Sequence, residues 1–161
     1  MIQAIRGTKD ILPGNSHFWQ FVENKFRTVS LQYGFKELRT PIFEKTELFS
    51  RGVDEETDIV NKEMYTFEDR GHESLTLRPE GTAPIVRSII ENSLLQQGQA
   101  LKVWYFGPYF RYERPQKGRF RQFLHFGIEA LGDEKPELDV EVISISLQLS
   151  LIHIYEPTRP Y

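Results

Sequence analysis

Two neighbouring segments, residues 103–112 and 121–131, restrict the fold of this chain more than any other part of its sequence. Both are rich in aromatic and β-branched residues, which are typical of β-strands. The connection between them, residues 113–119, contains Pro115, Gly118 and three basic side chains, and such a composition favours a turn. We therefore expect the two segments to pair as a long antiparallel hairpin closed by a basic loop.

The two faces of this hairpin differ in chemistry, because successive side chains of a strand point to opposite sides. Even-numbered positions carry the apolar residues Trp104, Phe106, Phe110, Tyr112, Leu124, Phe126, Ile128 and Ala130. Odd-numbered positions carry Gly107, Tyr109, Arg111, Glu113, Arg121, Phe123, His125, Gly127 and Glu129. The second face suits an anionic ligand with a flat ring, such as a nucleotide, since guanidinium groups bind phosphate and aromatic rings stack. A half-buried strand pair with a solvated outer face would give a similar pattern.

Apolar residues recur three or four positions apart in three other segments, a spacing typical of amphipathic helices. The first begins at Asn15 or Ser16, either of which caps a helix well, and ends at Gly34. The second covers residues 80–95, and the third covers residues 137–149, where the pattern also permits a strand. The sequence therefore predicts three helices.

Short alternating runs predict three further strands. Residues 35–38 alternate ahead of Pro41, which cannot donate to a sheet ladder and so indicates an edge, a bulge or an interface. Residues 63–70 and 73–78 are joined by a Gly-His pair. This arrangement predicts a second hairpin.

Composition excludes several classes of protein. The 161 residues suffice for one domain or part of one, and the net charge of −3 requires that any contact with nucleic acid come from a local basic patch. No cysteine is present, so disulfides, thiolate zinc sites and a cysteine nucleophile are excluded. No apolar run reaches the roughly 20 residues of a membrane helix, and the N-terminus lacks a secretory signal, so we expect no membrane contact and a cytoplasmic location.

Glycine and histidine patterns narrow the kinds of site further. No Walker A loop occurs and no glycine-rich turn follows a strand, so neither P-loop nor Rossmann binding of a nucleotide is indicated. His17, His72 and His153 have no partners at metal-ligand spacing. We therefore expect no protein metal site.

The segment Arg78-Pro79-Glu80-Gly81-Thr82 joins the second hairpin to a helix. We expect Thr82 to cap that helix and Glu80 to project into the same cavity as the polar face of the strand pair. A capped helix start without any further role fits these residues as well. The basic loop over residues 114–119 suits contact with a phosphodiester backbone, and a merely solvated loop is the alternative.

Four segments resemble the class II aminoacyl-tRNA synthetases. Motif 1 of that class is similar to GFKELRTPIFEKTELF, and motif 2, in the form found in histidyl-tRNA synthetases, is similar to YFGPYFRYERPQKGRFRQFLHFGIEALG. Those enzymes also resemble this chain in RGTKDILP and in KEMYTFEDRGHESLTLRPEGTAPIVR. The likeness covers residues 2–149, and the order of RPEGT and RYERPQKGR makes it specific.

The resemblance implies an α+β fold in which helices flank an antiparallel sheet, part of the catalytic core of a class II synthetase. It implies a homodimer formed through motif 1, residues 34–49. It also implies that the whole enzyme joins L-histidine to tRNA(His) with ATP and Mg²⁺, by way of histidyl-adenylate. Residues 1–149 would be the N-terminal part of that catalytic domain, and residues 150–161 an atypical tail left by truncation or by a sequencing artefact.

The resemblance also assigns roles to individual residues. Arg111 matches the motif 2 arginine that holds the α-phosphate of ATP, which makes it the expected catalytic residue. Glu113 is expected near the adenine amino group, Phe123 stacked on adenine, and Arg119 as a further contact to ATP. The expected histidine-binding residues are Glu80, Thr82, His125 and Glu129, and the expected tRNA-binding residues are Arg114, Gln116 and Lys117.

This sequence departs from the family pattern at two points. His125 stands where the family usually has Gln beside its substrate, with Leu124 where His is common, which leaves substrate selectivity open. The second histidine-specific segment, the motif 3 arginine and the anticodon-binding domain are missing. We therefore expect this chain alone to be inactive and to expose apolar surface.

Two other functions remain as alternatives. The regulatory subunit of ATP phosphoribosyltransferase resembles the synthetases and binds histidine without charging tRNA, but such a subunit has no need for the loop RYERPQKGR. A plain RNA-binding module would be basic overall, which the net charge of −3 does not indicate.

Overall fold

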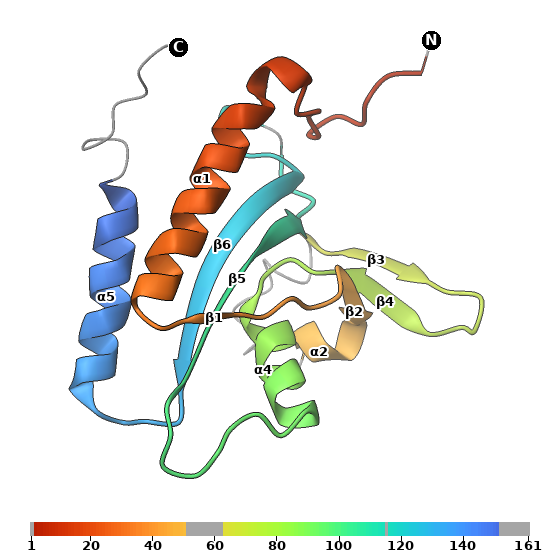
Figure 1. Cartoon of the computed structure of the whole chain (residues 1–161). Helices are drawn as coiled ribbons and strands as arrows, with labels where there is room; N and C mark the ends of the chain where they lie inside the picture. The colour runs from red at the N-terminus through yellow and green to blue at the C-terminus, as the bar shows by residue number, and fades with distance from the viewer. Residues whose placement is uncertain (1, 51–62, 115, 152–161) are drawn as a thin grey trace. The chain divides into compact units, whose positions relative to one another are not determined.

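The computed structural model describes residues 2–50, 63–114 and 116–151 (Figure 1). These residues divide between two compact units. Unit 1 comprises Met1–Asp10, Arg39–Asn92 and Phe106–His125. Unit 2 comprises Ile11–Leu38, Ser93–Tyr105 and Phe126–Tyr161. The predicted tail, residues 150–161, lies outside the described residues except for Ser150 and Leu151.

A three-stranded sheet with the order β1-β5-β6 carries the predicted hairpin. β5 covers Leu101–Phe110 and β6 covers Gln122–Leu131, and each strand has residues in both units. The arrows of β5 and β6 run in opposite directions in Figure 1, as predicted. β1, Lys36–Glu37, pairs parallel with β5 at the edge of this sheet, so the short strand expected before Pro41 is an edge strand.

Two helices form most of unit 2. α1, Pro13–Gln32, has a proline in its first turn, where a missing N–H is tolerated, and ends before Gly34, whose φ is 76°. α5, Pro136–Ser150, lies beside α1 (Figure 1). Both helices were predicted, and the strand alternative for α5 is wrong. The predicted cap of α1 at Asn15 or Ser16 is also wrong, because the N-cap is Leu12 and both residues lie within the helix. The buried side chains of this unit include Val29, Phe35, Trp104 and Ile145.

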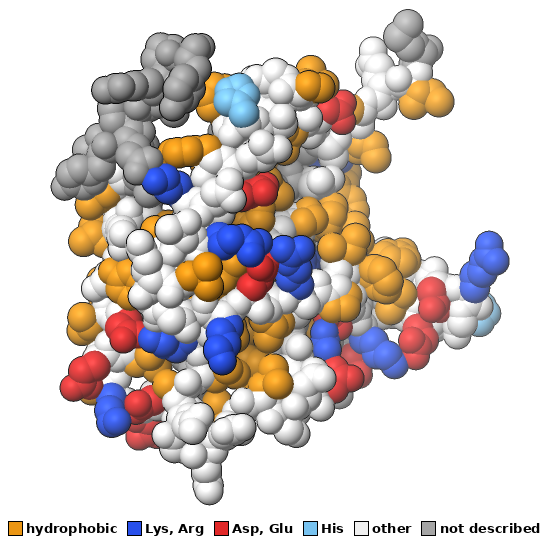
Figure 2. Space-filling model, in the orientation of Figure 1, with side chains coloured by type: hydrophobic (Ala, Val, Ile, Leu, Met, Phe, Trp, Pro, Cys, Tyr) orange, Lys and Arg blue, Asp and Glu red, His pale blue; other side chains and the backbone are white. Residues whose placement is uncertain are grey.

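Apolar side chains reach the surface of α5, where they appear as orange atoms in Figure 2. Val140, Ile143 and Leu147, three or four positions apart, are each more than half exposed. This exposure agrees with the expectation of exposed apolar surface. Among the described residues, no helix is long and apolar enough to cross a membrane.

Unit 1 contains a second three-stranded sheet with the order β2-β4-β3, antiparallel throughout. Its strands are β2, Phe43–Lys45, β3, Tyr65–Glu68, and β4, Ser74–Leu77, and its helices are α2, Thr46–Ser50, and α4, Thr82–Glu91. The buried side chain of Thr76 on β4 places its hydroxyl 2.9 Å from that of Thr46 and 3.0 Å from that of Thr66. These hydroxyl contacts link the central strand to α2 and to β3.

The hairpin of β3 and β4 turns at the predicted Gly-His pair, and an aspartate organises the turn. Asp69 Oδ1 accepts hydrogen bonds from Gly71 N at 2.8 Å and from Glu73 N at 3.0 Å. The left-handed residue of the turn is His72, with a φ of 62°. The side chain of Asp69 thus supplies the local hydrogen bonds that such a turn requires.

α4 is shorter than the predicted helix over residues 80–95. Asn92 Nδ2 donates to the carbonyl oxygen of Ser88 at 2.8 Å, and Ser93 takes a φ of 51°. A left-handed residue ends a helix. Leu94 and Leu95, which continue the apolar pattern, therefore lie outside it.

Candidate functional site

The carboxylate of Glu80, in the junction between β4 and α4, lies at the N-terminus of α4. Glu80 Oε2 accepts a hydrogen bond from Thr82 N at 2.6 Å, and Oε1 accepts one from Ala83 N at 3.0 Å. The first N–H groups of a helix have no partner within it, and a negative charge there is favourable. Gly81 occupies the N-cap position. The prediction that Thr82 caps α4 is therefore wrong, because the side chain of Glu80 does so.

Arg111 follows the end of β5, and its guanidinium is oriented by the β4–α4 junction. Its Nε donates to the carbonyl oxygen of Pro79 at 2.8 Å. Its Cζ lies 5.5 Å from the ring centroid of Phe123 on β6. The two side chains that the odd-numbered face was expected to bring together are therefore neighbours.

His125 joins the same group of side chains through the buried ring of Tyr109. The ring centroid of Tyr109 lies 4.9 Å from that of His125, edge to face, and 6.3 Å from that of Phe123. Burial lowers the pKa of His125, and the positive charges of Arg111 and Arg78 lower it further. The imidazole is therefore neutral at neutral pH.

Arg78, for which the sequence predicts no role, is buried, with only 5% of its surface exposed. Its Nε donates to the carbonyl oxygen of Pro108 at 3.0 Å, and its Nη1 donates to Thr40 O at 3.0 Å and Oγ1 at 3.2 Å. Its Cζ lies 4.4 Å from the ring centroid of Tyr109. The period of two along β4 puts Arg78 on the same face as Thr76, but nothing in the sequence marks that face as buried.

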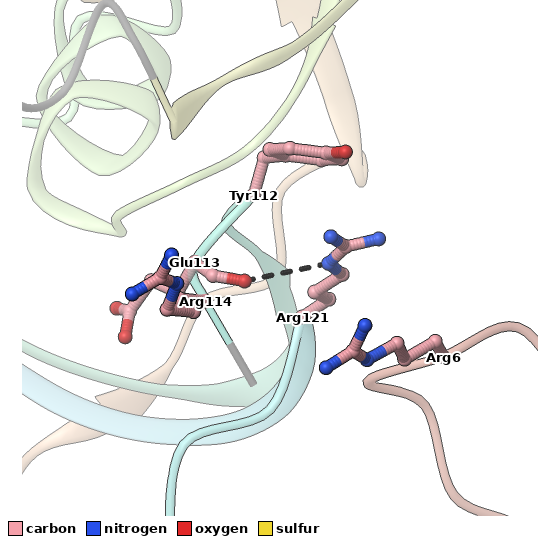
Figure 3. A pocket seen from close by; sticks show the side chains of 5 residues that line it. All are labelled: Arg6, Tyr112, Glu113, Arg114 and Arg121. Atoms are coloured by element: carbon pink, nitrogen blue, oxygen red, sulfur yellow. Dashed lines mark hydrogen bonds between the residues drawn. The ribbon is translucent and has the colours of Figure 1, made fainter. Parts of the chain in front are cut away.

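A pocket of about 610 Å³ opens at the start of the loop between β5 and β6 (Figure 3). It is lined by Arg6, Tyr112, Glu113, Arg114 and Arg121. Arg121 Nε donates to the carbonyl oxygen of Glu113 at 3.4 Å, and its Cζ lies 3.9 Å from the ring centroid of Tyr112. Tyr112 was expected on the apolar face of the strand pair. That placement is wrong because β5 and its alternation end at Phe110.

Glu113 has a buried carboxylate oxygen that lacks a donor. Among the described residues, no group donates a hydrogen bond to its Oε2. Its ion pair with Arg119 is long, with 3.6 Å between Oε2 and Nη1. A buried carboxylate oxygen without a hydrogen bond is unfavourable, so this atom suits the N–H group of a ligand.

The basic loop forms a tight turn at its tip. Arg119 N donates to the carbonyl oxygen of Gln116 at 3.0 Å, and Gly118 takes a φ of 83°. Gln116, Lys117 and Arg119 are all exposed. The turn therefore presents two cations and an amide to solvent.

Unit 2 holds Glu129, the remaining residue of the expected histidine site. Tyr105 Oη donates to Glu129 Oε1 at 3.2 Å. The buried ring of Tyr105 covers Gly127 so closely that a Cβ at that position would overlap the phenol. Tyr105 could have been found from the sequence, because the odd-numbered face extends to it two positions before Gly107. Glu129 and the group around Arg111 belong to different units.

The family-model and curated-protein comparisons lead to the same family. A family model described as histidyl-tRNA synthetase matches residues 7–157. The histidine–tRNA ligase of Geobacillus kaustophilus (strain HTA426) is 57% identical over 155 residues, which are 96% of this chain and 35% of that protein. The histidine–tRNA ligase of Bacillus cytotoxicus is 58% identical over 148 residues, which are 91% of this chain and 35% of that protein.

Two solved structures share the fold. The crystal structure of apo S. aureus histidyl-tRNA synthetase matches with a TM-score of 0.78 and 45% identity, covering 92% of this chain and 34% of that one. A Bacillus halodurans structure titled as an ATP phosphoribosyltransferase regulatory subunit/histidyl-tRNA synthetase has the same TM-score, 0.78, at 23% identity, covering 92% of this chain and 37% of that one. At that identity the second likeness concerns the fold alone.

The α+β fold and these matches define the class as that of the aminoacyl-tRNA synthetases. Within this class, the chain belongs to the histidyl-tRNA synthetase family. It spans about a third of the length of the curated relatives that it matches, at 35% of each.

Proposed function

We propose that this chain is the part of a histidine–tRNA ligase that binds ATP and L-histidine. In the proposed reaction of the whole protein, the carboxylate of histidine attacks the α-phosphorus of ATP and releases pyrophosphate. A hydroxyl at the 3′ end of tRNA(His) then accepts the histidyl group of the adenylate, which forms an ester and releases AMP. The observation that carries the proposal is the guanidinium of Arg111, oriented by the carbonyl of Pro79 beside the ring of Phe123.

The nucleotide is proposed to bind at the odd-numbered face within unit 1. The hydrogen bond of Arg111 to Pro79 uses Nε alone, which leaves the Nη groups for the α-phosphate. Phe123 would stack on adenine. The Oε2 atom of Glu113, which lacks a donor, would accept a hydrogen bond from the adenine amino group. Arg119 would add a cation for the phosphates.

The residues proposed to bind histidine are those that the family resemblance assigns, namely Glu80, Thr82 and His125 in unit 1 and Glu129 in unit 2. Each carboxylate oxygen of Glu80 accepts one backbone N–H and retains a second lone pair for the ammonium group of the substrate. A neutral His125 would not repel that ammonium group. A neutral imidazole also offers one donor and one acceptor, as the amide of Gln does, so His125 can replace the glutamine usual in the family.

The chemistry proposed here needs no protein nucleophile. The residues would act by holding the two reactants in line and by neutralising charge that develops on the α-phosphate, the second role falling to Arg111. Mg²⁺, when bound, would neutralise further charge on the ATP phosphates, through which this ion commonly binds. The described residues contain no group of three His, Asp or Glu side chains that could enclose a metal ion.

The tRNA and the second subunit are also part of the proposal. Arg114, Gln116 and Lys117 would meet the acceptor end of tRNA(His), which their exposure at the loop permits. A homodimer through residues 34–49 and a cytoplasmic location are proposed from the family resemblance. The alternative, a regulatory subunit of ATP phosphoribosyltransferase, is less supported, because the curated relatives at 57% and 58% identity are named histidine–tRNA ligases.

Isothermal titration calorimetry of the chain with ATP and with L-histidine tests the proposed function. We expect saturable binding of both ligands. GTP is the matched control, and it should bind more weakly because a carbonyl oxygen replaces the amino group that Glu113 would recognise. Binding of histidine without ATP would favour the regulatory subunit, and binding of neither to the folded chain would contradict the proposal.

A further inference from the structure

We propose that Arg78 is a positioning residue for Arg111 and acts through the carbonyl group of Pro79. Arg78 itself would contact neither ATP nor histidine. The inference rests on the proposed function, in which Arg111 binds the α-phosphate of ATP.

Arg78 is fixed through both its backbone and its side chain. Its N–H donates to the carbonyl oxygen of Ile42 at 2.9 Å, and its carbonyl oxygen accepts from Phe110 N at 3.1 Å. Its guanidinium donates to the carbonyl oxygens of Pro108 and Thr40, each at 3.0 Å. These hydrogen bonds tie the end of β4 to the segment before β2 and to the end of β5.

Pro79 connects Arg78 to Arg111, because it follows Arg78 in the chain and accepts a hydrogen bond from Arg111. Pro79 is fully buried, and its carbonyl oxygen accepts the hydrogen bond from Arg111 Nε at 2.8 Å. The ring of a proline fixes φ. Since Arg78 is held by its hydrogen bonds and the proline ring fixes φ of the next residue, the position of Pro79 and of its carbonyl group follows that of Arg78.

Among the described residues, no acidic side chain forms an ion pair with Arg78. In the part of the chain that the structure describes, its partners are carbonyl oxygens, the hydroxyl of Thr40 and the ring of Tyr109. A buried charge without a counter-charge is costly, and an apolar side chain of similar size would avoid that cost. The guanidinium of Arg78 therefore contributes through the geometry of its hydrogen bonds and not through an ion pair.

Gly107 lies against the guanidinium of Arg78 and leaves room for it because it has no side chain. A Cβ built on Gly107 would lie only 2.5 Å from Arg78 Nη2. A methyl group at this position therefore displaces the guanidinium while the residues Arg78, Pro79 and Arg111 themselves remain unsubstituted. Gly107→Ala is thus a second and independent way to disturb Arg78.

The test compares Arg78→Lys and Gly107→Ala with the control Arg87→Lys. Arg87 lies in the same unit and pairs with Glu44 at 2.5 Å and Glu91 at 2.6 Å. Lysine keeps the charge of arginine but not its planar fork of donors. We expect each test variant to weaken ATP binding about tenfold by calorimetry, as partial loss of a charged hydrogen bond would. We expect the control variant to bind ATP as the wild type does.

A coupling measurement separates positioning from general loosening of the fold. In the presence of Arg111→Ala, neither Arg78→Lys nor Gly107→Ala should weaken ATP binding further, because a residue that acts through Arg111 has nothing left to orient. A general structural role would instead give the same additional loss in both backgrounds. That additive result would overturn the inference.

The Nε proton of Arg111 gives a readout that does not need the nucleotide. Its hydrogen bond to Pro79 should slow its exchange with solvent in the wild type and in Arg87→Lys, and both test variants should accelerate that exchange. If the wild-type chain binds no ATP, the proposed function fails while this NMR measurement still tests Arg78. Unchanged exchange in a folded test variant would refute the role of Arg78, and Gly107→Ala serves if Arg78→Lys does not fold.

Discussion

The two units hold their charged residues in different ways. In unit 1, the guanidinium groups of Arg78 and Arg111 are held by the backbone carbonyls of Thr40 and Pro79, which are distant in sequence from the arginines that they hold. In unit 2, the carboxylate of Glu129 receives a hydrogen bond from a side chain on the neighbouring strand, Tyr105. The first arrangement depends on the path of the backbone, and the second depends on a few side chains.

This difference predicts different responses to substitution. Within the described part of the chain, the side chain of Arg111 donates to a single backbone carbonyl, so a change at Arg111 should alter ligand binding more than stability. In unit 2, Tyr105 both packs on Gly127 and donates to Glu129. Changes there should therefore affect the stability of the fold and the binding of histidine.

Gly127→Ala should give the largest effect. The added methyl group would overlap the buried ring of Tyr105, and neither strand can move without disturbing its neighbour. Overpacking of a core costs typically 1–3 kcal/mol, and we expect a loss of about 3 kcal/mol in the free energy of unfolding, measured by urea denaturation. Gly14→Ala in α1 is the control, because no atom lies within 4 Å of the added Cβ, and its stability should stay within about 1 kcal/mol of wild type. Equal stability of the two variants would contradict the proposed role of Tyr105 in packing on Gly127.

Arg111→Ala should have the next largest effect, which should be limited to the affinity for ATP. Loss of a hydrogen bond to a charged group is worth about 1.5–3 kcal/mol, so the affinity for ATP should fall roughly 10- to 100-fold in calorimetry. Arg111→Lys should recover part of the affinity, since the charge remains and the fork is lost. Histidine affinity and the midpoint of urea unfolding should change little. A large loss of stability at unchanged ATP affinity would place Arg111 with the structural residues instead.

The same contrast explains which parts of the site the sequence could predict. Alternation grouped Arg111 with Phe123 across the hairpin, and it grouped Gly127 with Glu129 along the single strand β6. Arg78 was missed because its partners Pro108 and Thr40 come from segments that only the tertiary fold brings near.

Boundaries were predictable where a residue type marks them. Gly34 correctly marked the end of α1. The start of α1 was misplaced at Asn15 or Ser16 because both residue types suit an N-cap, whereas the helix begins at Pro13. The end of α4 was missed because the apolar pattern continues to Leu95 while the backbone turns at Ser93. The cap of α4 was misassigned because Glu80 and Thr82 can both supply an oxygen to the first turn, and spacing alone does not choose between them.

Tyr105→Phe should have a smaller effect, confined to the contacts of unit 2 and to histidine binding. The substitution keeps the ring over Gly127 and removes only the hydroxyl that donates to Glu129. A lost hydrogen bond costs about 1 kcal/mol, so histidine affinity should fall about fivefold with ATP affinity unchanged, as calorimetry with each ligand would show. Glu129→Gln is the matched variant, and the double variant should lose less than the sum of the two. Purely additive losses would mean that the hydroxyl does not act through Glu129.

His125 should give the smallest effect, seen as a pH dependence of stability. The folded protein holds the pKa of His125 below its ordinary value of 6.5 through burial and the charges of Arg111 and Arg78, so the unfolded chain binds more protons as the pH falls. The contribution of neutral His125 to the free energy of unfolding is therefore complete above about pH 6.5 and is lost progressively below it. Urea midpoints at pH 7.5 and 5.5 should differ more in the wild type than in His125→Gln, which has no titrating group at this position. Equal differences in the two proteins would show that the charges of Arg111 and Arg78 do not act on this imidazole. These two arginines would then influence only the groups to which they donate hydrogen bonds.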